Sequence, residues 1–310
     1  MAWFPTQAQR DTWLMAIDCG ILVSVLLNRS FNAQEENYAT DPVANQEPLP
    51  ENQNVQNLYG PRVLEIATST PASLLAALES GADRIELCAA LTTGGLTPDQ
   101  AFIEYAVSTC ITYRVPVVIM IRPRPGSFVY DSRETTLMLR SIALARDAGA
   151  SGLVGGALLR NGRIDPVQTQ RFVEAAEELP FTFHRAFDQS PEQEKDFDLL
   201  HQLGVQRLLT GGQQGPASPE ALRRLAQHSQ GRISLIAAGG LRPTTLLPLL
   251  EIPGLREFHS AATAAATATI ATPTAAGPAT KQPLTLESSA YAGDPEADSA
   301  TVSALKELIK

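Results

Sequence analysis

The sequence predicts an α/β fold, a parallel (β/α)8 barrel of the TIM type with a disordered N-terminal extension and a low-complexity insertion before its last helix. Three observations support this prediction: short β-rich runs alternate with helical stretches, glycine turns recur before the runs, and capped prolines mark helix starts. Such alternation is typical of a parallel sheet covered by helices. The eight candidate strands cover residues 63–67, 84–88, 116–122, 152–158, 181–187, 207–211, 234–239 and 257–260.

Glycines and capped prolines mark the ends of these elements. Four glycines follow helical stretches and can adopt the left-handed conformation that ends a helix, with a strand about three residues later. They are Gly81, Gly149, Gly204 and Gly254. Helix starts are predicted where a capping side chain precedes a proline, at Thr97-Pro98, Asp165-Pro166, Ser190-Pro191 and Ser218-Pro219. An open doubly wound sheet is the alternative, but no Gly-rich phosphate fingerprint follows the first strand.

Composition divides the chain into four parts. Residues 1–60 form a polar extension predicted to be largely disordered, 61–262 the barrel, 263–292 an Ala/Thr/Pro insertion and 293–310 the last helix. The longest apolar run, 13–27, contains an acidic residue and is shorter than the roughly 20 residues that a membrane span needs. No membrane association is therefore expected.

Charge and cysteine content argue against nucleic-acid binding and against a disulfide framework. The net charge is −9 with 24 lysines and arginines, so nucleic acid is not an expected partner. The three cysteines, Cys19, Cys88 and Cys110, lie far apart without a CxxC pair, which indicates neither a disulfide framework nor a zinc ribbon. A reducing, intracellular location fits this pattern.

Strand alternation predicts a polar lumen. Residues two apart share one face of a strand, and the large apolar side chains must face the helices. This rule places five polar side chains inward: Glu65, Glu86, Arg122, His184 and His259. Barrel interiors are normally filled by branched apolar residues, so this set is a candidate catalytic or binding site.

Polar residues also follow the strands at the carboxyl-terminal face, where barrel enzymes keep their sites. Arg124, Arg185 and Asp188 lie there, and Arg122, Arg124 and Arg185 are expected to bind an anionic ligand. Three glycine pairs could bring backbone amides close to such a ligand: 94–95, 211–212 and 239–240. The alternative is a buried structural network in which Arg122 neutralises the two glutamates.

Five short motifs occur along the barrel. They are Arg84-Ile-Glu-Leu-Cys88, Gly94-Gly-Leu-Thr-Pro98, Met120-Ile-Arg-Pro-Arg124, Thr182-Phe-His-Arg-Ala-Phe-Asp188 and Glu257-Phe-His259. Together they resemble the CutC family, from about residue 64 to residue 261. The resemblance implies a cytoplasmic (β/α)8 barrel associated with copper homeostasis and copper binding, often self-associated as a homo-oligomer. The polar rim that it implies comprises Glu65, Glu86, Arg122, His184, Asp188 and His259.

The resemblance makes cysteine the residue on which copper binding depends. Relatives that bind copper are similar to this chain but carry a cysteine where it has Ala67, and strand register predicts Ala67 level with Cys88. Soft thiolates select Cu(I), and a single thiolate is a poor site. Cys88 together with His184 or His259 is the remaining candidate metal site.

Three functions stay open. The resemblance favours copper handling, with a copper ion as cofactor and partner. The residues alone favour an enzyme acting on a small anionic metabolite, in which Arg122 binds the anion, Glu86 or His184 moves a proton and Glu65 holds Arg122. The third is a non-catalytic barrel whose lumen network only stabilises the fold.

Overall fold

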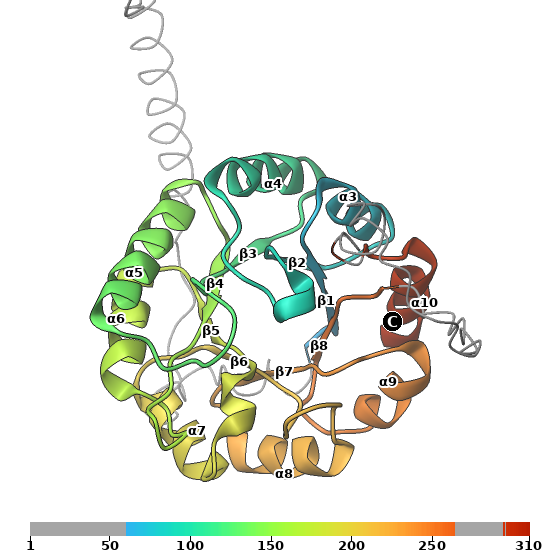
Figure 1. Cartoon of the computed structure of the whole chain (residues 1–310). Coiled ribbons are helices and arrows are strands. Elements are labelled where there is room, and N and C mark those ends of the chain that lie inside the picture. The colour runs from blue at the N-terminus through green and yellow to red at the C-terminus, as the bar shows by residue number, and fades with distance from the viewer. Residues whose placement is uncertain (1–59, 264–293, 295) are drawn as a thin grey trace, which may run out of the picture. The chain divides into compact units, whose positions relative to one another are not determined.

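The fold is a closed barrel of eight parallel strands. The computed structural model describes residues 60–263, 294 and 296–310. Each strand pairs in parallel with the next, and the last pairs with the first (Figure 1). The strands are β1 (Val63–Thr68), β2 (Arg84–Leu87), β3 (Val117–Met120), β4 (Gly152–Gly155), β5 (Phe181–Phe183), β6 (Arg207–Thr210), β7 (Ser234–Ala237) and β8 (Glu257–Ser260). The predicted TIM-type barrel is therefore confirmed.

Some predictions concern residues outside this description. The N-terminal extension, the apolar run 13–27, Cys19 and nearly all of the Ala/Thr/Pro insertion lie outside the described residues. Within the described part of the chain, no helix is long and apolar enough to span a membrane.

Eight α-helices in the described ranges surround the barrel (Figure 1). They are α3 (Pro71–Glu79), α4 (Gln100–Tyr113), α5 (Ser132–Asp147), α6 (Pro166–Ala176), α7 (Gln193–Gln202), α8 (Pro219–Ser229), α9 (Pro243–Leu250) and α10 (Ser299–Ile309). Two short 3-10 helices, η1 (Leu91–Thr93) and η2 (Arg185–Gln189), follow β2 and β5. α10 lies between α9 and α3 and completes the ring, and just before it the backbone N–H of Ala297 donates to Ser73 Oγ at 2.6 Å.

Turn and cap chemistry sets most boundaries as predicted. The four glycines have φ between 80° and 92°, and a strand begins three residues after each of them. Asp165 and Ser218 cap α6 and α8 by accepting from backbone N–H groups three residues further on.

Two predicted helix starts are wrong by two residues. Asp99 caps α4 by accepting from the backbone N–H of Phe102, while Thr97 Oγ1 accepts from the backbone N–H of Arg122. α7 begins at Gln193: Ser190 Oγ donates to Asp196 and accepts from the backbone N–H of Glu192, two residues on, so it closes a turn before the helix and does not cap it.

Four strands are shorter than predicted by two residues or more. β3, β4, β5 and β7 end at Met120, Gly155, Phe183 and Ala237 instead of residues 122, 158, 187 and 239. The chain stays buried beyond these ends, at Ile121, Leu158 and Phe187, so apolar character continues after the sheet has ended. In β5 the continuation is η2.

Alternation along the strands gives the lumen two unlike halves. On each strand, every second residue faces the helices, and the apolar residues among these pack in the core beneath the helices; examples are Leu64, Ile66, Ile85, Leu87, Ile119 and Phe258. Strands β1, β2 and β8 turn charged groups inward: Glu65, Arg84, Glu86, Glu257 and His259. Strands β3 and β4 turn only apolar groups inward, and β6 and β7 do so at their carboxyl ends: Val118, Met120, Val154, Leu209 and Ile236. At their amino ends, β6 and β7 turn Arg207 and Ser234 toward Glu257.

Candidate functional site

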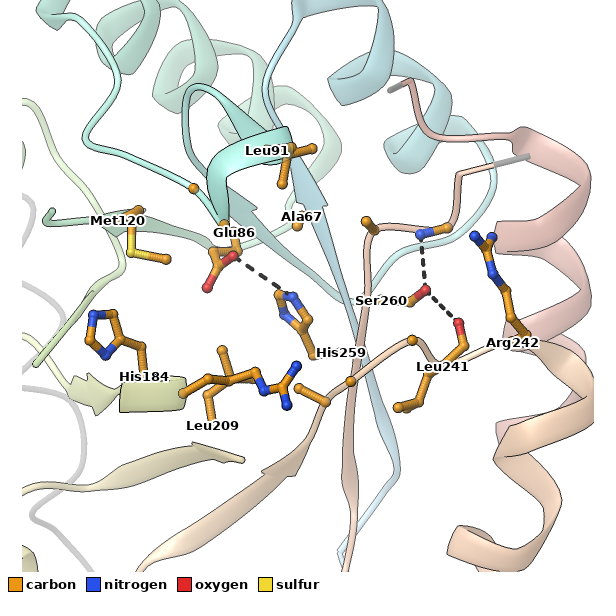
Figure 2. Close-up of a pocket in the computed structure, with 18 of the residues that line it drawn as sticks. Ala67, Glu86, Leu91, Met120, His184, Leu209, Leu241, Arg242, His259 and Ser260 are labelled. Atoms are coloured by element: carbon orange, nitrogen blue, oxygen red, sulfur yellow. Dashed lines mark hydrogen bonds and ion pairs between the residues drawn. The ribbon is translucent and has the colours of Figure 1, made fainter. Parts of the chain in front are cut away.

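A pocket of about 250 Å³ opens at the carboxyl-terminal ends of the strands (Figure 2). Its polar lining comprises Glu86, His184, Arg185, Arg242, His259 and Ser260. Its apolar lining includes Leu91, Met120, Phe128, Leu209 and Leu241, and the predicted glycine pairs 94–95 and 239–240 also line it. The third pair, 211–212, does not, because its amides donate to Asp188 and Thr210. Barrel enzymes bind their substrates at this end of the strands.

Four charged side chains form a continuous series that ends in the pocket. Arg84 Nε donates to Glu65 Oε2, and the other oxygen of Glu65 lies 2.7 Å from His259 Nδ1. His259 Nε2 lies 3.8 Å from Glu86 Oε2, the contact drawn in Figure 2. Strand register brings them together, because Glu65 is level with Arg84 on β2 and with His259 on β8.

Burial and neighbouring charges set the protonation of this series. Burial alone would raise the pKa of Glu65, but Arg84 and His259 outweigh it and lower that pKa to about 2. The ionised Glu65 therefore accepts a hydrogen bond from His259 Nδ1–H. Burial would lower the pKa of His259, but Glu86 and Glu65 outweigh it and raise that pKa. Burial raises the pKa of Glu86 to about 7, against the opposing effect of His259.

Glu86 is the least satisfied member of the series. Its side chain is 4% exposed, and its Oε1 atom has no hydrogen-bond partner among the described residues. Native proteins rarely leave a buried carboxyl oxygen without a partner. A carboxyl group with a pKa close to neutral, at the wall of a pocket, is suited to giving and taking protons.

Another group of polar side chains lies below the pocket. Arg84 Nη2 donates to Glu257 Oε2 at 2.5 Å, and Glu257 also accepts from Ser234 Oγ. Arg84 and Glu257 are not among the site residues predicted from the sequence. Each lies two residues before a predicted one, Glu86 or His259, and that spacing alone would have placed them inward.

Arg122 does not meet the glutamates, so the predicted ion pairs are wrong. Its Nη1 donates to the carbonyls of Thr93 and Gly95 at 3.0 and 3.1 Å, and its Nη2 to that of Gly126 at 3.1 Å. The guanidinium also lies over the ring of Phe128, 4.8 Å from its centre. β3 has already ended at Met120, so strand alternation no longer fixes the direction of Arg122; Arg84 takes the role predicted for it.

The three polar residues predicted at the strand ends have separate environments. Arg124 Nε pairs with Glu134, and its other nitrogens bond loop carbonyls outside the pocket lining. Arg185 lines the pocket, where its Nε donates to Asp188 at 2.7 Å and its Nη2 to the carbonyl of Gly215 at 2.6 Å. Asp188 also accepts from Thr210, so this carboxylate positions Arg185 and does not face the pocket itself.

His184 lines the pocket from the end of β5, across the barrel from β1. Its Nδ1 accepts from the backbone N–H of Ala186 at 3.4 Å, which places the ring proton on Nε2. Burial, and after it the charge of Arg122, lowers the pKa of His184 to about 3. His184 is therefore neutral at neutral pH, and it is unsuited to the proton transfer proposed for it on sequence grounds.

Cys88 lies apart from these polar groups. Its thiol donates to the carbonyl of Thr68 at 3.6 Å, and burial raises its pKa far above the ordinary range. Its side chain packs in an apolar layer with Val118 and Val154. The predicted level pairing with Ala67 is wrong: Ala67 is level with Glu86, because the stagger of the barrel shifts β2 by two residues relative to the prediction.

One group of side chains has the spacing of a metal site. Glu65, Glu86 and His259 offer ligand atoms within 4.8 Å of one another. Glu65 is already engaged by Arg84 and by His259 Nδ1, which leaves only Glu86 and His259 Nε2 free to face an ion. Carboxylate and imidazole donors suit divalent ions better than Cu(I), which prefers thiolates. The donors present here therefore do not fit Cu(I).

Together, the fold and the pocket define a (β/α)8 barrel with a small polar site at the carboxyl ends of its strands. The sequence profile of the CutC family matches residues 62–264. The chain belongs to the CutC family. It is 39% identical over 201 residues to a CutC family protein of Histophilus somni (strain 2336), which covers 64% of this chain and 82% of that protein.

Two further relatives agree with this assignment. A CutC family protein of Agrobacterium fabrum (strain C58) is 40% identical over 206 residues, which covers 66% of this chain and 80% of the relative. A crystal structure of the Streptococcus agalactiae CutC protein, named for copper homeostasis, superposes with a TM-score of 0.62 at 29% identity. That match covers 64% of this chain and 98% of the other.

Proposed function

We infer that this barrel is an enzyme that moves a proton on a small anionic molecule bound at the barrel mouth. One observation supports this function above the others: Glu86, whose pKa burial raises to about 7, faces the pocket beside His259 with one oxygen unpartnered. General acids and bases work best when their pKa lies near the working pH.

The neighbouring groups supply the rest of such a site. His259 Nε2 lies 3.8 Å from Glu86, while Glu65, itself held by Arg84, fixes the imidazole ring through Nδ1. Arg185 and Arg242 line the pocket; Arg185 is paired with Asp188, whereas the Arg242 guanidinium bonds, among the described residues, only the neutral Thr263, so its positive charge favours an anionic molecule.

A turnover screen tests this function. Carboxylated and phosphorylated metabolites would be incubated with the wild-type protein and followed by NMR, and each converted compound then given to Glu86→Gln. We expect turnover to fall about 100-fold, because the amide can neither take nor release the proton. Glu79→Gln, at the exposed end of α3, is the matched control and should match the wild type. Conversion of no compound, or equal turnover by Glu86→Gln, would contradict the proposal.

Copper handling is the second candidate, favoured by the name of the Streptococcus agalactiae relative and by the spacing of Glu65, Glu86 and His259. The state of Cys88 argues against Cu(I) binding, because its thiol keeps its proton and is surrounded by apolar side chains. A Cys88 and His184 pair would need the thiol to lose its proton in that layer.

Competition with a Cu(I) chelator separates the two candidates. We expect wild type and Cys88→Ala to bind Cu(I) weakly and within about twofold of each other, because a buried thiol with a raised pKa is a poor ligand. Cys110→Ala, which removes a buried helical cysteine, is the control. A tenfold or greater loss of affinity in Cys88→Ala alone would restore the copper function.

A further inference from the structure

Arg122 is a buried cation without a counter-charge. It is 5% exposed, and in the described ranges no carboxylate lies within ion-pair distance of it. Its hydrogen bonds go to three neutral carbonyls, and its Nε has no partner there. Buried charges in proteins are normally paired, since taking an ion out of water costs several kcal/mol. Arg84, by contrast, is a buried guanidinium paired with two carboxylates.

Two more polar atoms beside Arg122 lack a well-directed hydrogen bond. They are His184 Nε2 and the hydroxyl of Tyr130, which belong to side chains 4% and 5% exposed. Each is near enough for the Arg122 charge to lower its pKa. Burial, the larger effect, raises the pKa of Tyr130 to about 12, so its hydroxyl keeps its proton. All three groups therefore have a proton to donate: the Tyr130 oxygen lies close to the Arg122 guanidinium, but the Tyr130 hydroxyl proton and His184 Nε2–H have no acceptor among the residues that the structure describes.

These donors surround one aromatic ring at the wall of the pocket. Phe128 lies under the Arg122 guanidinium and meets the His184 ring edge-on, with centroids 4.7 Å apart. Both Phe128 and His184 line the pocket (Figure 2 labels His184). On the same wall, a Cβ at Gly94 would lie 3.2 Å from Arg122 Nη1, so the glycine leaves the guanidinium uncovered on that side. Arg122 thus lies directly behind Phe128 and Gly94, which both line the pocket.

We propose that Arg122, His184 Nε2 and the Tyr130 hydroxyl form an oxyanion subsite that binds the anionic group of the substrate. The group is a carboxylate or a phosphate. Both have negatively charged oxygens, which can accept hydrogen bonds from all three donors. This subsite rests on the proposed function and deepens it: the anionic end binds on the β3 and β5 side, and the reacting carbon faces Glu86 and His259 on the β2 and β8 side. The anion also supplies the missing counter-charge.

Anion titration of the folded protein tests the subsite. Inorganic phosphate and acetate would be titrated separately into wild type, Arg122→Met and Arg224→Met, with acetamide as the neutral analogue of acetate, and affinity measured by calorimetry and melting temperature. We expect at least one anion to bind the wild type and to raise its melting temperature, and Arg122→Met to weaken that anion about 10- to 100-fold. Arg224→Met is the matched control, because Arg224 is an exposed arginine paired with Glu220 on α8, outside the pocket lining.

The outcomes identify the ligand class and separate this proposal from the proton-transfer function. Binding of phosphate alone indicates a phosphorylated substrate, and binding of acetate alone indicates a carboxylated one. His184→Phe, which removes the donor and keeps a ring, should lower the same affinity if the variant melts like the wild type. Equal anion binding by wild type and Arg122→Met, or no binding of either anion, would overturn the subsite. A turnover loss in Glu86→Gln would then still support proton transfer.

Discussion

Replacing Arg84 with methionine should lower the free energy of unfolding by about 3–5 kcal/mol, a large part of the stability of a domain. Arg84 is 5% exposed and donates to both Glu65 and Glu257 inside the barrel. Methionine has a similar reach but no charge, so the two carboxylates would stay buried with less compensation. Denaturant unfolding at neutral pH measures the loss.

Two further variants show whether the unpaired carboxylates cause it. Arg224→Met removes an arginine from an exposed pair with Glu220 and should cost less than about 1 kcal/mol. Adding Glu65→Gln and Glu257→Gln to Arg84→Met should recover part of the loss, because neutral amides are cheaper to bury. If Arg84→Met is as mild as Arg224→Met, the series beneath the pocket does not depend on this guanidinium.

The fold was predictable because its signals are local. A glycine such as Gly81 or Gly149 ends a helix through its own φ, and the strand after it follows within three residues. The errors arose where one residue has two suitable partners. Ser190 could cap a helix, but in the folded chain its hydroxyl bonds Asp196, a choice that only tertiary structure decides.

The site was most predictable inside the strands, although His184 and Arg185, just past the end of β5, also line the pocket. Glu65, Glu86 and His259 lie within β1, β2 and β8, where side chains alternate strictly, and they meet as expected. Arg122 follows the end of β3, where the alternation rule has no physical basis. The partner of each side chain depends in addition on the register between strands. Glu65 pairs with Arg84 because the strands of the barrel are staggered. This stagger is a property of the closed sheet and cannot be read from either strand alone.

The stability of wild type relative to Glu86→Gln should fall as the pH rises from about 4.5 to about 7. Folding raises the pKa of Glu86 from its ordinary 4.5 to about 7, so in this window the unfolded chain has lost a proton that the folded chain retains. The folded state binds more protons there, and its stability therefore decreases with increasing pH. At about 1.4 kcal/mol for each pKa unit, the relative change is on the order of 3 kcal/mol.

Neighbouring groups sharpen this pH signature. His259 contributes in the same direction, because a group with a raised pKa stabilises the fold at low pH and loses that effect as the pH rises. Part of the rise in the His259 pKa is caused by Glu86, so the His259 contribution also differs between the two proteins. Glu65 acts in a different pH range. Because folding lowers its pKa from 4.5 to about 2, its contribution to stability is lost only as the pH falls below about 4.5, in wild type and in Glu86→Gln alike. Unfolding curves at several pH values, with Glu79→Gln as the exposed control, measure the difference. A difference between wild type and Glu86→Gln that stays constant from pH 4.5 to 7 would mean that Glu86 is ionised throughout, and then it could not serve as the acid of a proton-transfer site.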